Sequence, residues 1–329
     1  MSREALLLSD ADVRRCLSEP EIVQLVHEVF QAWGEGQFVM PAKVSTDLRR
    51  FGLDSAFSAM PGYLAGRKVA GLKLAAGCAH NPAHGLPYIV ATIILSDPLT
   101  GITLAVLDGC YISGVRTGAQ AAWAAKYTAN PNSRIAAIIG AGTQSRMALR
   151  ALASFFPFEE ARVADISPAA QDRFQAEMEK DLGLRIVKTA NCQEAVEGAD
   201  IVCCATPDRG PVVMDSWVKK GATAIALGSY QEYEDEFILR ANKVVVDSWA
   251  QCSHRGALKN VVESGRFGDK DLYAEMGELA CGKKPGRHAP DERILVVPIG
   301  LALHDLAAAG LAYCRALEKG LGVRFKFGE

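Results

Sequence analysis

The 329-residue sequence has no long apolar run and no excess of either charge. Its longest apolar stretches, such as residues 88–95, are far shorter than the roughly 20 residues that a membrane-spanning helix requires. The 36 Lys and Arg residues nearly balance the 38 Asp and Glu residues, and the formal net charge of -2 argues against a nucleic-acid partner. Before any apolar stretch of signal-peptide length, the N-terminus reaches an acidic residue. We therefore expect no nucleic-acid partner, no membrane partner and no export signal.

Paired cysteine motifs are also lacking. The nine cysteines are an odd number without any C-x-x-C spacing, which is typical of reduced thiols in a cytoplasmic protein. Only His80 and His84 lie close together among the histidines, and with Cys78 they could be metal ligands. Because Pro82 and Gly85 interrupt any helix that would turn these side chains to one side, we expect solvated loop histidines and no metal.

The composition, with 49% hydrophobic and 22% charged residues, is that of a globular protein, and the length favours two domains on a prior of about 150 residues each. Ser9 is a candidate N-cap, and residues 20–33 carry an apolar stripe at helical spacing. Segments rich in β-branched residues, separated by Gly and Pro, then predict an antiparallel sheet. These segments are residues 68–74, 88–95 and 102–107. The helix predicted over residues 113–129 is rich in Gly and Ala, so it can approach another backbone closely, and we place it between the domains.

After Pro131, short apolar strands alternate with helical stretches, as in a parallel sheet built from βαβ units. The strands predicted there are residues 135–139, 162–164, 185–187, 201–204, 222–227, 243–246 and 294–299. Residues 261–291 are polar and rich in Gly, and a helix predicted over residues 303–317 returns to the first domain. We therefore expect an α/β fold. A Rossmann-type parallel-sheet domain of residues 121–302 follows an α+β domain of residues 1–120, which residues 303–329 rejoin.

A glycine-rich turn follows the strand predicted over residues 135–139. It reads Gly140-Ala141-Gly142-Thr143-Gln144-Ser145 and leads directly into a helical pattern. The first glycine permits the tight turn, the second leaves room for a pyrophosphate, and the helix N-terminus offers free N–H groups and a positive dipole end. We assign Gly140, Gly142, Thr143 and Gln144 to the binding of a dinucleotide.

An acidic residue stands at the distance that such a motif requires. Asp165 follows the next predicted strand, 23 residues after Gly142 (165 minus 142). Its carboxylate can accept hydrogen bonds from both ribose hydroxyls, and its charge would repel a 2'-phosphate, so we expect NAD (NADH) and not NADP. Alternatively, Asp165 caps the helix that begins after Ser167.

Other cofactor candidates lie at the ends of predicted strands. Thr206, after the strand predicted over residues 201–204, is a further cofactor residue or an ordinary turn residue. We also assign Leu227 and Ile299, at the ends of later strands, to the cofactor.

Motifs spread over nearly the whole chain resemble the ornithine cyclodeaminase/μ-crystallin family. They are Met60-Pro61, Gly71-Leu72-Lys73, Asn81, Gly85-Leu86-Pro87, the 95–101 turn, Arg116-Thr117-Gly118-Ala119, the 140–145 turn and Gly300-Leu301-Ala302 with Asp305. The resemblance implies a homodimer with a substrate and dimerisation domain beside the Rossmann domain. It also implies a substrate carboxylate held by cationic side chains and a lysine that acts near the reacting carbon.

The resemblance gives three cations a role. Lys73 matches the family's catalytic lysine, and Arg116 matches an arginine that lies near both the substrate carboxylate and the cofactor phosphate. Lys43 stands in the place of a second arginine that binds the carboxylate. The residues themselves agree, because an arginine can bind an oxyanion bidentately and a lysine inside an apolar strand needs a partner or a lowered pKa. The alternative for Lys73 is an edge-strand lysine that faces solvent.

One loop departs from the family pattern. Cyclodeaminases of the family carry a catalytic Asp where this chain has Tyr230, and Tyr88 replaces a usual threonine. A carboxylate suits the handling of a side-chain amine, whereas a phenol with a pKa near 10 does not, so cyclodeamination of ornithine is disfavoured. We assign Tyr230 to substrate binding. Glu232, Glu234 and Asp235 could supply the missing carboxylate, although a solvated acidic loop is the simpler expectation.

We therefore expect an NAD-dependent oxidoreductase that reduces a small α-imino acid to the amino acid, or runs the reverse dehydrogenation. The imino acid would be a ketimine or an iminodicarboxylate such as iminosuccinate. Two alternatives stay open: a cyclodeaminase-type ammonia lyase that recycles NAD internally, and a non-catalytic NAD(P)H-binding protein of the crystallin type.

Overall fold

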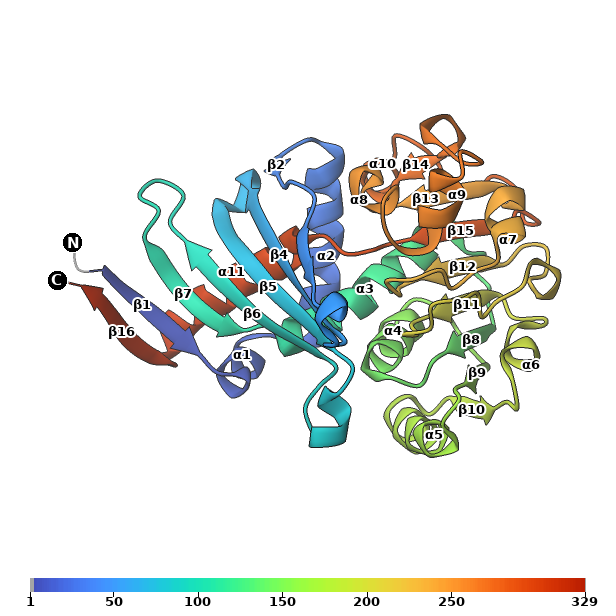
Figure 1. The fold of residues 1–329 in the computed structure, drawn as a ribbon, viewed down its shortest axis with the longest axis horizontal. Helices are drawn as coiled ribbons and strands as arrows, with labels where there is room; N and C mark the ends of the chain where they lie inside the picture. The colour runs from blue at the N-terminus through green and yellow to red at the C-terminus, as the bar shows by residue number, and fades with distance from the viewer. Residues whose placement is uncertain (1–2, 329) are drawn as a thin grey trace. The chain divides into compact units, whose positions relative to one another are not determined.

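The computed structural model describes residues 3–328, which form two compact units. The first unit contains the chain up to Arg116 and again from Leu301 onward, and the second unit contains Thr117–Gly300. Helix α3 (Cys110–Thr128) carries the chain from the first unit into the second (Figure 1).

The first unit is built on a mixed sheet in the order β16-β1-β7-β6-β5-β4-β2, with β3 paired to β4. The strands are β1 (Arg3–Leu8), β2 (Phe38–Val39), β3 (Val44–Asp47), β4 (Ser55–Leu64), β5 (Val69–Cys78), β6 (Ile89–Ser96), β7 (Thr103–Asp108) and β16 (Val323–Gly328). The predicted strands β5, β6 and β7 are confirmed as antiparallel neighbours. The sheet also contains β1, which was not predicted and which pairs in parallel with β7.

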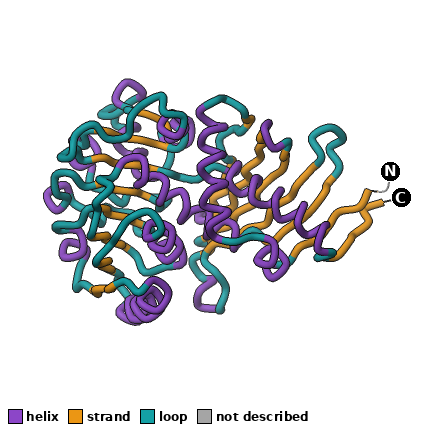
Figure 2. The backbone as a smooth tube through the Cα atoms, turned by 180° about the vertical axis from the view of Figure 1, so that it is seen from behind, coloured by secondary structure: helices purple, strands orange, loops and turns teal. Residues whose placement is uncertain are grey.

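Helices cover one face of this sheet. They are α1 (Asp10–Cys16), α2 (Glu19–Gly34) and α11 (Ala302–Lys319), and Figures 1 and 2 show α2 and α11 on the same side. Ser9 is confirmed as the N-cap of α1, where its hydroxyl accepts the N–H of Asp12 and the Asp12 carboxylate accepts in return. Glycine lets α11 lie close to the strands, since a Cβ at Gly62 would stand 2.9 Å from Leu303.

The second unit is built on an all-parallel sheet in the order β10-β9-β8-β11-β12-β15-β13-β14. Its strands are β8 (Ile135–Ile139), β9 (Glu160–Ala164), β10 (Arg185–Lys188), β11 (Ile201–Cys204), β12 (Thr223–Ala226), β13 (Lys243–Val246), β14 (Ala274–Glu275) and β15 (Ile294–Val297). Every strand predicted for this part of the chain is present, within two residues at each end. The order runs outward from β8 in both directions, and a ligand in such folds binds outside the carboxyl ends of the strands at this switch point.

Helices form most of the connections between the strands of the second unit. The α-helices are α4 (Thr143–Ala153), α5 (Pro168–Leu182), α6 (Cys192–Val196), α7 (Asp235–Arg240), α8 (Trp249–Cys252), α9 (Lys259–Glu263) and α10 (Met276–Ala280). The chain also has 3-10 turns η1 (Arg49–Phe51), η2 (Ala65–Arg67), η3 (Asn81–His84), η4 (Asp215–Trp217), η5 (Gly256–Leu258) and η6 (Asp269–Asp271). Residues 261–291 thus contain α10, β14 and most of α9, despite their polar composition.

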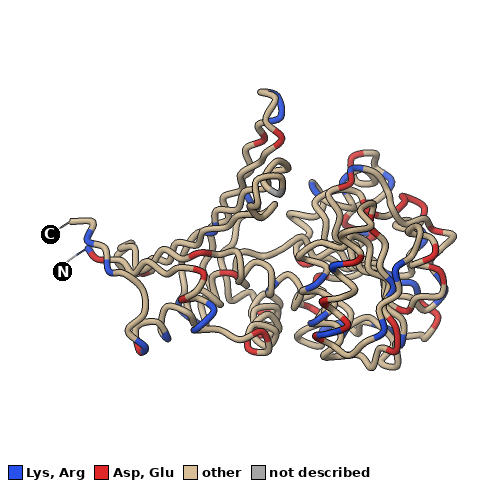
Figure 3. Tube along the Cα trace, turned by 90° about the horizontal axis from the view of Figure 1, so that it is seen from below, with Lys and Arg blue, Asp and Glu red and all other residues tan. Residues whose placement is uncertain are grey.

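Both units carry charges of both signs. Figure 3 shows Lys and Arg interspersed with Asp and Glu in each of them. Between residues 3 and 328, no helix has the length and apolar character that crossing a membrane requires. Nor do any three His, Cys, Asp or Glu side chains within that range come together in a way that could hold a metal ion.

Helices α3 and α4 are in backbone contact at Gly118. A Cβ placed on Gly118 would overlap the carbonyl group of Met147 on α4, which is backbone and cannot turn away. We therefore expect Gly118→Ala to destabilise the protein by about 1–3 kcal/mol, the usual range for an overpacked core position. Urea unfolding measures the loss. Gly66→Ala is the matched control, because its Cβ would meet only Gln37 Oε1 at 3.5 Å, and equal stability of the two variants would contradict this account of the packing.

Candidate functional site

Lys73 lies inside the first unit and not at its surface. Strand β5 runs between β4 and β6, and the Lys73 side chain is only 1% exposed, so the alternative of an edge-strand lysine in solvent is wrong. Its ammonium donates to Asp305 Oδ1 at 2.7 Å and to Ser113 Oγ at 2.8 Å. The three side chains come from β5, α11 and α3, which lie far apart in the sequence.

Arg116 completes this buried group, which we call the Lys73 cluster: Lys73, Ser113, Arg116 and Asp305. The Arg116 Nε atom lies 3.1 Å from Oδ1 and 3.0 Å from Oδ2 of Asp305. Lys73 and Asp305 are almost fully buried, and Arg116 is 8% exposed. Two cations thus share one carboxylate, so the cluster carries a net positive charge while Lys73 is protonated. Two cationic side chains around one carboxylate favour the binding of a further anion.

Burial controls the proton affinities of these groups. It lowers the pKa of Lys73 to about 8, and the Arg116 charge acts in the same direction, although Asp305 partly opposes both. For Asp305, burial is outweighed by the charges of Arg116 and Lys73, so its pKa falls below the usual range. The neighbouring His304 is fully buried, and burial lowers its pKa to about 3, so its ring is neutral at physiological pH. Lys73 is therefore the member of the cluster that can exchange a proton near neutral pH.

The dinucleotide turn of the second unit has the expected geometry. Gly140 follows β8 with φ +94°, a conformation that suits glycine, and a Cβ there would stand 2.7 Å from the carbonyl oxygen of Ala205. Gly142 is the N-cap of α4, and a Cβ on it would meet no atom within 4 Å. Open space therefore lies beside the first N–H groups of α4, where Thr143 begins the helix.

Several polar atoms around this turn fit a bound dinucleotide. Gln144 Oε1, Ser145 Oγ and Thr206 Oγ1 are buried, and none of them has a hydrogen-bond partner within the described part of the chain. Buried polar atoms normally find partners, so an absent ligand or ordered water accounts for such orphans. Together with the open space at Gly142, these atoms match the donors and acceptors that NAD would require.

Asp165 is fixed at the same turn. One carboxylate oxygen accepts the N–H of Ala141 at 2.7 Å, and the other accepts the N–H of Ser167 at 2.8 Å. The cap of helix α5 is Ser167 itself, whose hydroxyl accepts the N–H of Ala170, so the alternative of Asp165 as the helix cap is wrong. Asp165 thus ties the end of β9 to the glycine turn, which is where an adenosine ribose is bound in such folds.

The loop after β12 is partly buried, contrary to expectation. Glu232 has 0% exposure, and its carboxylate accepts the N–H of Thr206 at 2.9 Å and the N–H of Gly228 at 2.8 Å. Burial raises the pKa of Glu232 to about 7, while the two backbone donors oppose that rise. The expectation of a solvated acidic loop is therefore wrong for Glu232, because two backbone N–H groups bind its carboxylate and Gly228, which has no Cβ, leaves room for it.

The other acidic residues of this loop have separate partners. Glu234 accepts the N–H of Asp215, and Asp235 pairs with Arg266. The Tyr230 ring lies 5.7 Å from the Arg209 guanidinium carbon. Glu234 and Asp235 are thus both engaged by other groups of the second unit.

The remaining predicted residues lie at loops and strand ends. Leu227 follows β12 and donates its N–H to Cys204, and the Ile299 side chain, after β15, would contact a Cβ on Gly256. Lys43 lies in the first unit, in the loop before β3, and is partly exposed. Its role as a carboxylate ligand stays a prediction.

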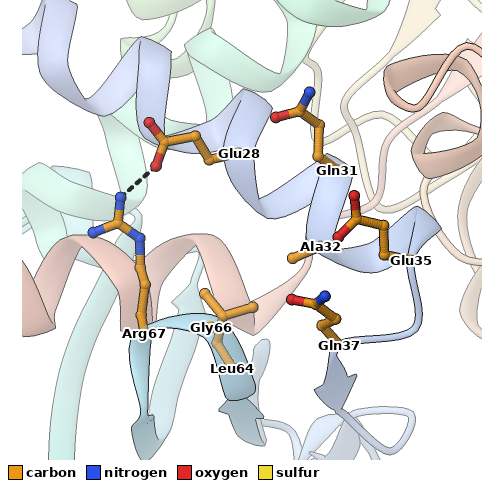
Figure 4. A pocket seen from close by; sticks show the side chains of 8 residues that line it. All are labelled: Glu28, Gln31, Ala32, Glu35, Gln37, Leu64, Gly66 and Arg67. Carbon is orange, nitrogen blue, oxygen red and sulfur yellow. Dashed lines mark hydrogen bonds and ion pairs between the residues drawn. The ribbon is translucent and has the colours of Figure 1, made fainter.

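A separate cavity of about 220 Å³ lies between α2 and the end of β4. Figure 4 shows its lining, where Arg67 reaches Glu28 and two further polar side chains, Gln31 and Gln37, face the same space. It includes no member of the Lys73 cluster, and we assign it no role.

No role was predicted for Asp305 or Ser113 from the sequence. A signal for Asp305 was available, because this aspartate lies among the buried residues Leu303, Leu306 and Ala307 in the first turns of α11. A charge in such a helix needs a counter-charge, and Lys73 on an apolar strand has the same need.

Known proteins are similar to this chain over nearly its whole length. The model of the ornithine cyclodeaminase/mu-crystallin family matches residues 3–320. Alanine dehydrogenase of Archaeoglobus fulgidus is 36% identical over 330 residues, which cover 98% of this chain and 99% of the relative.

Two solved structures show the same fold. The Δ1-pyrroline-2-carboxylate reductase of Thermococcus litoralis, in complex with NADH and L-proline, has a TM-score of 0.92 at 33% identity and covers 97% of this chain and 99% of its own. An archaeal alanine dehydrogenase dimer with bound NAD has a TM-score of 0.90 at 36% identity, with coverage of 98% and 99%. The chain therefore belongs to the ornithine cyclodeaminase/mu-crystallin family.

Proposed function

We propose that the protein is an NAD-dependent reductase of a small α-imino acid, or the corresponding amino-acid dehydrogenase. The observation that carries the proposal is the buried Lys73 cluster, which combines a surplus of positive charge with a lysine whose pKa is about 8. An imino acid presents a carboxylate and a basic nitrogen on adjacent atoms, and these are the two groups that such a cluster can bind. Relatives that act on alanine and on a cyclic imino acid support this substrate class.

Each residue has a defined task in this proposal. Arg116 binds the substrate carboxylate, for which its planar guanidinium offers parallel N–H donors, and Lys43 adds a second positive charge. Lys73 keeps the imine nitrogen protonated, which makes the adjacent carbon electrophilic, and Asp305 orients Lys73 through the 2.7 Å hydrogen bond. Bound NADH would supply a hydride to that carbon.

The residues of the second unit hold the cofactor in this proposal. The N–H groups at the start of α4 receive the pyrophosphate, and Asp165 accepts the ribose hydroxyls. Gly140, Gly142, Thr143, Gln144 and Thr206 line the turn, whereas Leu227 and Ile299 offer apolar contact. Tyr230 would contact the substrate side chain.

We further propose a homodimer in a reducing compartment such as the cytoplasm. The sheet face opposite α11 exposes Phe57, Leu74 and Val90, and neighbouring strands place these apolar side chains on one surface. A related alanine dehydrogenase is a dimer. All nine cysteines are free thiols, as expected where disulfides do not form.

An NADH-oxidation assay tests the function. We expect turnover with cyclic imines or with small α-keto acids in the presence of ammonia or methylamine. Formation of proline and ammonia from L-ornithine with catalytic NAD, followed by NMR, would instead favour the cyclodeaminase. Tight NADH binding without turnover of any of these substrates would favour a crystallin-type binding protein.

Replacement of Lys73 tests the catalytic assignment. We expect Lys73→Met to abolish turnover and to leave NADH affinity nearly unchanged, because Lys73 lies in the first unit and the dinucleotide turn in the second. In the unmodified protein, the reductive kcat/KM should fall as the pH rises through about 8, since Lys73 of the free enzyme then loses its proton, and the oxidative kcat/KM should rise. Lys180→Met, at the exposed end of α5, is the matched control. A Lys73→Met variant with full activity would remove Lys73 from the mechanism.

Replacement of Asp165 tests the cofactor assignment. Asp165→Ser should weaken NADH use by about ten- to a hundredfold, the usual effect of losing a charge-assisted hydrogen bond of roughly 1.5–3 kcal/mol. Asp165→Asn keeps the shape of the side chain but removes the charge and places an NH2 group against the N–H of Ala141 or Ser167, so it should relax the discrimination against NADPH and also weaken NADH use. Steady-state kinetics with both cofactors provide the measurement. A preference of the unmodified protein for NADPH would contradict the assignment.

A further inference from the structure

Glu232 is a buried carboxylate for which the proposed reaction has no use. It has 0% exposure, and the groups that act on its pKa include no Lys, Arg or His of residues 3–328. Burying a carboxylate without a cation costs free energy, so other groups must stabilise its charge.

Backbone N–H groups from two loops replace the missing cation. Oε1 accepts the N–H of Thr206 at 2.9 Å and Oε2 accepts the N–H of Gly228 at 2.8 Å. Thr206 lies in the loop after β11, and Gly228 lies in the loop after the adjacent strand β12. One side chain therefore joins two neighbouring loops at the carboxyl edge of the parallel sheet.

The joined loops form one wall of the dinucleotide turn. A Cβ on Gly140 would stand 2.7 Å from the Ala205 carbonyl oxygen and 3.2 Å from Thr206 Cγ2, so this wall lies against the glycine that shapes the turn. Gly228 leaves room for the carboxylate, since a Cβ there would stand 2.5 Å from Glu232 Oε1. A shift of Glu232 would therefore release the Thr206 wall.

We propose that Glu232 is a positioning residue of the cofactor site, whose ionised carboxylate holds the loops after β11 and β12 in the conformation that binds NADH. The inference rests on the proposed function. Glu232 acts through Thr206 and Gly228, and its two oxygens face backbone donors and not a substrate. This arrangement also explains why it does not replace the family's catalytic Asp.

The geometry makes cofactor binding depend on pH. Both oxygens accept N–H donors, which only the ionised form can do without loss, and burial raises the pKa of Glu232 to about 7. The titratable groups that face it are the thiols of Cys203 and Cys204 on β11 and the phenol of Tyr233, and burial keeps all three protonated near neutral pH. NADH affinity should therefore increase as the pH rises from about 6 to 8.

Glu232→Gln is the decisive variant. Its amide oxygen can accept only one of the two N–H groups, and its NH2 group opposes the other. We expect NADH to bind roughly tenfold more weakly at pH 8, an order of magnitude for one lost charge-assisted hydrogen bond, and we expect the affinity to lose its dependence on pH. Hydrogen exchange without cofactor should become faster in the segments around Thr206 and Gly228.

Two further variants separate this role from general stability. Gly228→Ala should displace the carboxylate and reproduce both effects with Glu232 intact. Glu234→Gln, in the same loop, removes a carboxylate that accepts the N–H of Asp215 and not that of Thr206 or Gly228, and it should bind NADH like the unmodified protein at every pH. Isothermal titration calorimetry between pH 6 and 8.5 measures the affinities.

The outcomes are distinct. A lower melting temperature of Glu232→Gln with unchanged NADH affinity and pH profile would reduce Glu232 to a structural residue and overturn the inference. Unchanged exchange around Thr206 would overturn it as well. Failure of the unmodified protein to bind NADH would contradict the proposed function, whereas the exchange measurement would still report whether Glu232 joins the loops.

Discussion

Asp305 places an ionised carboxylate inside the apolar helix α11, and Lys73 and Arg116 supply the charges that this burial requires. The three residues belong to elements that lie up to 232 positions apart in the sequence, so their contacts tie the C-terminal helix to the sheet and to the start of α3. Apolar side chains of similar size would pack there at lower cost in free energy. The cluster is therefore better explained by its chemistry than by stability.

That chemistry follows from an imbalance of charge. One carboxylate cannot neutralise both cations, and burial already lowers the pKa of Lys73 to about 8. A substrate carboxylate would supply the missing negative charge and, by doing so, would favour the protonated lysine that an imine nitrogen needs. Binding and proton supply are then two effects of one electrostatic arrangement.

In the second unit, backbone N–H groups stabilise two carboxylates, where the first unit uses cationic side chains. Asp165 and Glu232 are both carboxylates at the carboxyl edge of the parallel sheet, and each accepts two N–H groups from the loops. Asp165 fixes the glycine turn from one side of β8, and Glu232 fixes Thr206 from the other side. The shape of the dinucleotide turn therefore depends on two carboxylates that backbone N–H groups hold in place.

The sequence predicts the second unit better than the first. Strands such as β8 and β11 are continuous apolar runs buried on both faces, and their bounds were predicted correctly. Strand β4 contains Pro61 and Gly62, which conceal its alternation, and β1 and β16 depend on pairing between the two ends of the chain. Local patterns carry no information about such distant pairing.

The same limit applies to the site. The turn at Gly140 and the acid at Asp165 are recognisable because their spacing is local. The direction of the Glu232 side chain is set by tertiary contacts with Thr206, so an acidic composition suggested solvent where the structure has a buried carboxylate.

Isotope labelling tests directly whether the protein transfers a hydride from NADH to the α-carbon of an imino acid. NADH deuterated at C4 of the nicotinamide, in either stereochemical form, is supplied with the imino acid, and the amino acid formed is examined by mass spectrometry and NMR. We predict that one stereochemical form of the cofactor delivers one deuterium to the α-carbon, with one NADH consumed for each amino acid formed. An unlabelled product, or ammonia release without net consumption of NADH, would contradict it.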